Sequence, residues 1–114
     1  MSIVRDVLKK KGSEVLSVTP DTDVFNAIEK MAKISAGTAL VIDGDQLVGI
    51  LSERDFIRKI YLQKKCQESA KVSEIMSTSL TTISPDEKLE NCMSTMTEKR
   101  IRHLPVCEDG KVVG

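Results

Sequence analysis

The 114-residue sequence predicts an α/β (α+β) fold built from two copies of one unit, each with the order strand, helix, strand, strand, helix. Three observations support this prediction. The pentapeptide SVTPD, which begins at Ser17, recurs as TISPD at Thr82, an offset of 65 residues. Apolar residues after each pentapeptide keep the spacing of one helical face. Short apolar runs that end at turn residues then follow in both copies.

The repeat continues at the same offset without a gap, and the matched positions are apolar or glycine. The matched pairs are Val24 with Leu89, Ala27 with Cys92, Ile28 with Met93, Met31 with Met96, Val41 with Val106, Leu47 with Val112, Val48 with Val113 and Gly49 with Gly114. Upstream, residues 4–8 resemble residues 72–76 at an offset of 68. We therefore predict a first motif with its N-terminal linker at residues 1–71 and a second motif at residues 72–114, which together form one domain.

Each copy is expected to place an amphipathic helix after a short first strand. The apolar positions of this helix follow the i, i+3, i+4, i+7 pattern in both copies and are Val24, Ala27, Ile28 and Met31, then Leu89, Cys92, Met93 and Met96. Pro20 or Pro85 precedes the helix. Acidic residues are expected in its first turn, where they favour the helix dipole, namely Asp21 and Asp23, then Asp86 and Glu87.

Two strands are expected after each of these helices. Residues 39–42 and 104–107 are the apolar runs of the first, and turns at 43–45 and 108–110 lead into the second. In the first copy a further helix begins near Ser52, marked by apolar or aromatic residues at 56, 57, 60 and 61. The second copy stops at Gly114, in the third residue of its last strand. Because such an end leaves an unpaired sheet edge, we expect this motif to be incomplete and the chain to continue.

Composition excludes several classes of function. Seventeen basic and seventeen acidic side chains cancel, so no global field would hold nucleic acid or an anionic membrane. No apolar run could span a bilayer and no signal peptide begins the chain, which predicts a soluble, cytoplasmic protein. Cys66, Cys92 and Cys107 lack a Cys-x-x-Cys pair, which predicts reduced thiols rather than disulfides or a metal site.

The doubled pattern, the segment GILSERD that begins at Gly49 and the segment KRIRHLPV that begins at Lys99 together resemble a CBS-domain pair, or Bateman module, over nearly the whole chain. The likeness is to small proteins that consist of one such pair, from bacteria and plant mitochondria. It implies two units packed across a pseudo-twofold axis and a homodimer. It also implies a non-catalytic module whose cleft between the motifs binds AMP, ADP, ATP, NAD or S-adenosylmethionine and so regulates a partner or its own assembly.

Carried over to this sequence, the resemblance implies a ligand site built from three groups of residues. Ser52 and Asp55 occupy the ribose-binding Ser/Thr-x-x-Asp positions, and a carboxylate suits a cis-diol because it accepts two charge-assisted hydrogen bonds. An adenine slot is implied for the two segments Ser17, Val18, Thr19 and Thr38, Ala39, Leu40. Candidate phosphate ligands are the cationic side chains of Arg54, Arg100, Arg102 and His103.

Two other interpretations stay open. Ser52-x-x-Asp55 is also a capping box, in which hydroxyl and carboxylate satisfy backbone donors and nothing binds, so a purely structural dimerisation module without a ligand is the alternative function. Catalysis finds little support, because His103 is the single histidine and no Gly-x-Ser-x-Gly segment occurs. We therefore predict no enzyme activity, no catalytic cofactor and no metal, and the regulated partner is left unidentified.

Overall fold

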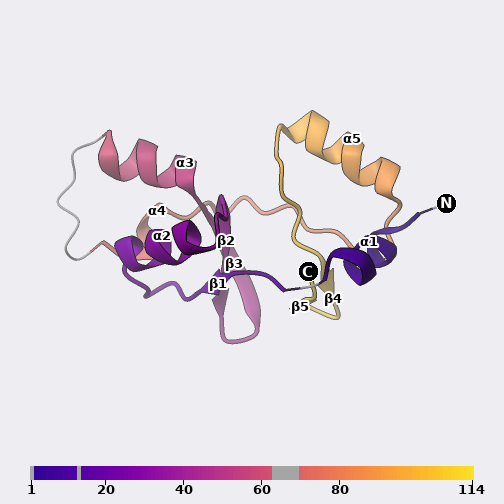
Figure 1. The fold of residues 1–114 in the computed structure, drawn as a ribbon, viewed down its shortest axis with the longest axis horizontal. Coiled ribbons are helices and arrows are strands. Elements are labelled where there is room, and N and C mark those ends of the chain that lie inside the picture. Colours follow the sequence, from indigo (N-terminus) through magenta and orange to yellow (C-terminus); the bar gives the residue numbers. More distant parts are fainter. Residues whose placement is uncertain (1, 13, 63–69) are drawn as a thin grey trace. The chain divides into compact units, whose positions relative to one another are not determined.

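The computed structural model describes residues 2–12, 14–62 and 70–114, and it divides into two compact units (Figure 1). The central unit is Val15–Leu80. The terminal unit combines Met1–Glu14 with Thr81–Gly114. No helix in the described ranges is both long enough and apolar enough to cross a membrane.

The central unit contains a three-stranded sheet in the order β1-β2-β3. β1 (Ser17–Val18) pairs in parallel with β2 (Thr38–Asp43), and β2 pairs antiparallel with β3 (Gln46–Ser52). Gly44, in the turn between β2 and β3, has a φ of 64°, a conformation that glycine adopts without steric cost. The predicted order of strand, helix, strand, strand is confirmed, because α2 (Val24–Lys33) connects β1 to β2.

The predicted core face of α2 is largely confirmed. Val24, Ala27 and Met31 are buried, and Ile28 packs partly buried against the same cluster. One face of the sheet supplies the opposite side of this core, with the alternation that a strand imposes. The buried residues of the cluster are Val18, Val24, Ala27, Met31, Ala39, Val41, Leu51, Ile60, Val72 and Ile75.

The helix expected near Ser52 is present as α3 (Glu53–Phe56), which continues directly into a π-helix, η1 (Ile57–Tyr61). Of its predicted apolar positions, Ile60 is buried and Phe56 packs partly buried against the core. The Phe56 ring also meets Phe25 of α2 in a T-shaped contact, with centroids 5.4 Å apart. Ile57 and Tyr61 are 50% and 70% exposed, so these two positions do not belong to the core of the unit.

The prediction that acidic residues crowd the first helical turns is wrong in detail. Asp23 is the N-cap of α2, and its carboxylate accepts hydrogen bonds from the amides of Phe25 (2.8 Å) and Asn26 (3.2 Å). No acidic residue lies within the first turn of α2. In α5 (Leu89–Lys99) Glu90 is the acidic residue of that turn. Each proline begins a short turn before its helix, and this turn moves the acidic residues ahead of the first helical position.

The terminal unit contains α1 (Val4–Lys11), α5 and a two-stranded antiparallel ribbon of β4 (Cys107–Glu108) and β5 (Lys111–Val112). A parallel bridge between Ile83 and Val106 stands in place of a regular first strand. The strand predicted at 104–107 is therefore shorter than expected. The buried cluster of the terminal unit consists of Val4, Cys92 and Val106, and the partly buried Leu89 packs against this cluster. Met93 is 68% exposed, so its predicted place on the core face of the helix is wrong.

Each unit includes the short helix that precedes the other repeat in the chain. In the terminal unit the Val4 amide of α1 donates to the carbonyl of Glu87 (2.9 Å). In the central unit the Val72 amide of α4 (Val72–Ile75) donates to the carbonyl of Thr22, also at 2.9 Å. These bonds occupy matching positions of the two repeats. The linker helices are therefore exchanged, which the contiguous order of the sequence does not reveal.

The matched glycines mark where the exchanged segments approach the strands most closely. A Cβ atom on Gly49 would lie 2.5 Å from Sδ of Met76, and one on Gly114 would lie 2.6 Å from Cδ2 of Leu8. Met76 and Leu8 are themselves matched by the repeat of the linkers. Glycine therefore leaves room for the linker at both positions, and at Gly49 a Cβ would also meet the backbone carbonyl oxygen of Ser77 at 3.1 Å.

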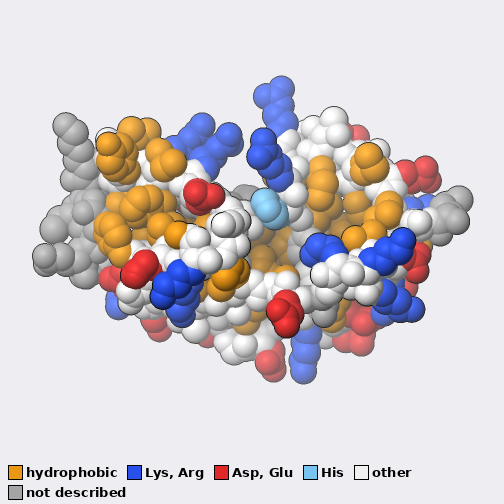
Figure 2. Space-filling view, viewed as in Figure 1, with side chains coloured by type: hydrophobic (Ala, Val, Ile, Leu, Met, Phe, Trp, Pro, Cys, Tyr) orange, Lys and Arg blue, Asp and Glu red, His pale blue; other side chains and the backbone are white. Residues whose placement is uncertain are grey.

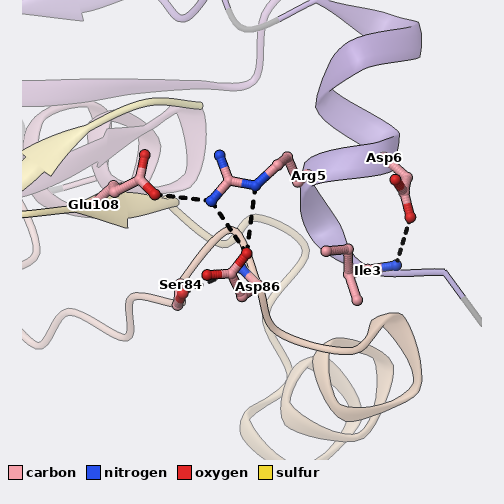
Figure 3. Close-up of polar contacts among 6 residues, drawn as sticks. All are labelled: Ile3, Arg5, Asp6, Ser84, Asp86 and Glu108. Carbon is pink, nitrogen blue, oxygen red and sulfur yellow. Dashed lines mark hydrogen bonds and ion pairs between the residues drawn. The ribbon is translucent and has the colours of Figure 1, made fainter.

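The linker helix α1 of the terminal unit forms an ion cluster through Arg5. Arg5 Nη2 lies 2.8 Å from Glu108 Oε2 and 3.1 Å from Asp86 Oδ1 (Figure 3). The hydrogen bond to Glu108, followed by that to Asp86, raises the pKa of the Arg5 guanidinium. In the central unit Ser73 occupies the position matched to Arg5. The cluster is solvent-accessible, so its contribution to stability is small.

Candidate functional site

The strand register divides the predicted adenine-slot residues between the two faces of the central sheet. The pairs Ser17 with Leu40, Leu40 with Ile50, and Thr38 with Ser52 lie directly opposite one another. Opposite residues share a face and successive residues alternate. Ser17, Thr38, Leu40, Ile50 and Ser52 therefore share the face turned away from the core cluster. We call this face the ligand face.

Val18 and Ala39 belong to the other face. Their side chains are 5% and 1% exposed and pack in the core cluster. Apolar contact from these two side chains is thus not available to a ligand on the opposite face, and only their backbone groups remain. Thr19 is also engaged locally, since its amide donates to the Thr22 hydroxyl (3.1 Å) and the two hydroxyls lie 2.9 Å apart.

Ser52 and Asp55 form the complete capping box that their spacing allows. Ser52 ends β3 and is the N-cap of α3. The Asp55 amide donates to Ser52 Oγ (3.1 Å). In return, Asp55 Oδ2 accepts from the Ser52 amide (3.0 Å) and from the Ser52 hydroxyl (2.9 Å). The two residues are brought together at the end of the strand, and the cap fixes the orientation of the carboxylate.

The second carboxylate oxygen of Asp55 is not used by the cap. Its contact in the described part of the chain is an ion pair with Lys59, with Nζ 3.8 Å from Oδ1. The Asp55 side chain is 17% exposed. The same ammonium of Lys59 donates to the carbonyl of Ile75 (3.0 Å) at the end of α4. Sequence reasoning missed Lys59, although its i, i+4 spacing from Asp55 on a helix was a readable signal.

The four predicted phosphate ligands are divided between the units. Arg54 is exposed in α3 of the central unit, directly beside the cap. Arg100, Arg102 and His103 are exposed in the terminal unit, in the segment that follows α5. Arg100 ends α5 in the left-handed region, at φ 54°, as does the matched Ser35 after α2. Apart from Arg100, Arg102 and His103, the nine remaining predicted site residues all lie in the central unit.

The two matching halves and the capped strand end agree with what family comparison finds. The model of the CBS-domain family matches residues 4–62 and 72–114, so the chain belongs to the CBS-domain family. Two matched ranges in one chain are a CBS pair, as the sequence predicted.

Two curated relatives show the range of the family around this chain. The mitochondrial CBS domain-containing protein CBSX3 of Arabidopsis thaliana is 38% identical over 120 residues, which cover 97% of this chain and 58% of the relative. This chain therefore spans little more than half of that protein. The CBS domain-containing protein YhcV of Bacillus subtilis is 30% identical, over 100% of this chain and 79% of its own length.

Solved structures confirm the predicted fold class of tandem CBS repeats. The CBS domain of NE2398 superimposes with a TM-score of 0.92 at 45% identity and covers 99% of this chain and 88% of its own. A CBS-domain protein described as a signal-transduction protein, from Burkholderia ambifaria MC40-6, gives 0.92 at 40%, with 99% and 85% covered. The CBS pair of protein MJ0100, in complex with 5′-methylthioadenosine and S-adenosylmethionine, gives 0.85 at 25%, with 99% and 90% covered.

Proposed function

We propose that this CBS pair is a non-catalytic regulatory module that binds an adenine nucleotide, AMP, ADP, ATP or NAD. The observation that carries the proposal is the carboxylate of Asp55, which is oriented by its cap through Oδ2 while Oδ1 stays outside the cap. The complex of MJ0100 with two adenosine compounds supports the choice of ligand class.

The ribose would bind at the Asp55 carboxylate. An ionised carboxylate accepts hydrogen bonds from a hydroxyl more strongly than a neutral group does. Oδ2 already accepts two hydrogen bonds from Ser52, so Oδ1 is the acceptor with free capacity. The 17% exposure of the side chain leaves it accessible at the strand end while limiting competition from water.

The adenine ring would rest on the ligand face defined above. Ile50 supplies apolar surface there beside Leu40, which is 9% exposed, and Ser17 and Thr38 supply hydroxyls that can fix its orientation. Arg54 is the cation nearest in sequence to Asp55 and is proposed to bind phosphate. Contacts from Arg100, Arg102 and His103 to phosphate stay predictions of the family resemblance.

Regulation would follow from a difference in affinity between two arrangements of the protein. A ligand shifts such an equilibrium only by its differential affinity for the two states. We propose a homodimer as the responding assembly. Exposed apolar side chains on α2 and η1 are available for such contacts, among them Phe25, Ile57 and Tyr61. Figure 2 shows hydrophobic side chains at the surface of the face that it draws. Ligand binding could equally regulate a protein partner instead of the homodimer.

Thermal melting with added ligand tests the proposal. A ligand that binds only the folded state raises the melting temperature with its concentration, by about 2.7 kcal/mol of added stability at a hundredfold excess over Kd. We expect this response for at least one of AMP, ADP, ATP, NAD and S-adenosylmethionine. We expect it to be weaker for Asp55→Ala, whose amide still donates to Ser52. No response to any of the five compounds would overturn nucleotide binding.

The second candidate function is a structural dimerisation module without a ligand. The completeness of the capping box favours it, because Asp55 has a sufficient structural role in the cap. This candidate predicts that Asp55→Ala lowers stability by about 1 kcal/mol, as the loss of a cap does, and that nucleotides have no effect. The cytoplasmic location stays a prediction, and the plant relative is described as mitochondrial.

A further inference from the structure

We propose that Lys59 is the positioning residue that couples occupancy of Asp55 to α4, the linker helix that leads into the second repeat. This inference rests on the proposed nucleotide site at Asp55 and adds a route by which that site is regulated. Lys59 contacts both ends of the route within the central unit. Its ammonium lies 3.8 Å from Asp55 Oδ1 and donates a 3.0 Å hydrogen bond to the Ile75 carbonyl.

The first step concerns the Asp55 carboxylate. Oδ2 is committed to Ser52 by two hydrogen bonds, whereas Oδ1 faces only Lys59 among the described polar groups within ion-pair distance. A ribose hydroxyl that binds here must therefore share Oδ1 with the ammonium. When hydroxyl donors take up part of the negative charge, the attraction between Oδ1 and Lys59 weakens, because a carboxylate oxygen has limited acceptor capacity.

The second step concerns the end of α4. Ile75 is the last residue of this helix, so its carbonyl has no partner within the helix and carries negative partial charge. An ammonium released from Asp55 would donate more fully to this carbonyl. Lys59 is well placed to do so, since its side chain is 43% exposed and retains freedom to shift between the two acceptors.

The third step converts that shift into a change in the linker. The Ile75 carbonyl belongs to the same peptide group as the Met76 amide, which donates to the Val72 carbonyl at 2.9 Å. Hydrogen bonds in a chain polarise and strengthen one another. A stronger bond at Ile75 therefore stabilises the last turn of α4. Met76 also packs against Gly49, so the change reaches the strand that leads to Ser52.

The π-helix supports this arrangement. Ile60 is buried in the core cluster, which anchors η1, and the neighbouring Lys59 lies at the surface where it can reach both acceptors. Isolated π-helical turns are rare and occur frequently at functional sites. Because a half-exposed ion pair adds little to folding stability, replacement of Lys59 is expected to leave the protein folded.

The test is hydrogen exchange at the Met76 amide, read by NMR in the full chain. In the protein without ligand, Asp55→Asn removes the charge that holds Lys59 and should slow exchange about two- to fivefold, the range set by a weak ion pair. Lys59→Met should abolish this effect of Asp55→Asn, and Lys59→Arg should retain it. Arg58→Met is the matched control, since Arg58 is an exposed cation of the same π-helix and should leave the effect intact.

The same measurement with saturating AMP, or with whichever of the five compounds raises the melting temperature, completes the test. Bound nucleotide should slow Met76 exchange to a similar extent when Lys59 is present and leave it unchanged in Lys59→Met. An equal slowing in Lys59→Met, or no effect of Asp55→Asn in either background, overturns the coupling. If no nucleotide binds the unmodified protein, the proposed function fails, while the ligand-free comparison still decides whether Lys59 links Asp55 to α4.

Discussion

The central and terminal units share a sequence pattern but bury different parts of it. In the central unit, α3 and η1 lie beside α2, and Phe56 meets Phe25 edge to face. Ile28 is partly buried there. In the terminal unit the matched Met93 is 68% exposed on α5. The apolar period of a helix therefore defines a face, whereas burial of that face needs another element to cover it.

The backbone hydrogen bonds between linkers and repeats, by contrast, match in the two units. The Val4 amide bonds to Glu87 as the Val72 amide bonds to Thr22, and both bonds measure 2.9 Å. Both linker helices begin with an acidic side chain that accepts from the amide of the N-cap residue, Asp6 from Ile3 and Glu74 from Lys71. Backbone groups that leave water must find partners, which keeps this pattern constant while side chains vary.

The largest expected difference between the units concerns two helix methionines. Met31 is fully buried, so Met31→Ala should lower the free energy of unfolding by about 2–5 kcal/mol through lost transfer energy and a cavity. Met93→Ala should change it by less than about 0.5 kcal/mol, as at other surface positions. Urea unfolding followed by circular dichroism measures both. A large loss in Met93→Ala would show that α5 is covered in solution.

The glycine pair offers the next test. Gly49→Ala should cost about 1–3 kcal/mol, because the new Cβ would meet the backbone carbonyl of Ser77 at 3.1 Å as well as the Met76 side chain. The three atoms nearest to a Cβ on Gly114 all belong to the Leu8 side chain, which can move, so Gly114→Ala should lower stability by less. The same unfolding measurement decides. An equal loss of stability in the two variants would contradict the expectation that the backbone contact at Gly49 is less able to adjust than the side-chain contact at Gly114.

Loss of a helix N-cap should produce a smaller difference in stability between the two units. Asp23→Ala should lower stability by about 1 kcal/mol because two amide hydrogen bonds at the start of α2 are lost. Lys88 is the matched N-cap of α5 and makes no side-chain cap bond, so Lys88→Ala should be nearly neutral. Thermal melting of the two variants gives the comparison. A neutral Asp23→Ala would show that the cap adds nothing beyond tertiary packing.

The smallest effect is expected from the buried thiol at Cys92, where the central unit has Ala27. Burial, followed by the charge of Glu87, raises the pKa of Cys92 above the usual 9.0. The unfolded thiol therefore ionises first as pH rises. Stability that is complete below pH 9.0 should then be lost above it, by at most about 1.4 kcal/mol per pH unit for one thiol.

Urea midpoints between pH 7 and 10 measure this loss, and Cys92→Ala should reduce it. Burial also raises the pKa of Cys107, so part of the dependence should persist in that variant. An unchanged pH dependence in Cys92→Ala would assign the effect elsewhere. Cys66, predicted with the other two as a reduced thiol, lies outside the described residues.

Sequence pattern was sufficient for the repeat, for the buried face of α2 and for the strand end at Ser52. Each follows from local rules: a helix places residues three and four apart on one face, and a strand alternates its side chains. The capping box was equally local, and the pairing of Ser52 with Asp55 is confirmed. The ligand assignments made from the family resemblance remain predictions.

Other features required the tertiary structure. Assignment of Val18 and Ala39 to the core, and of Ser17 and Leu40 to the ligand face, depended on strand register, which periodicity leaves open by one residue. The exposure of Met93 depended on what covers α5.

The sequence by itself determined that two matched motifs exist and that Ser52 and Asp55 meet at the end of a strand. Only the tertiary structure decided that each linker helix packs with the other repeat and that Lys59 joins Asp55 to Ile75. The physical reason is the distance in sequence between the residues that interact. Hydrogen bonds within one helical turn are encoded by neighbouring residues, whereas contacts between distant segments depend on how the whole chain satisfies its buried backbone groups.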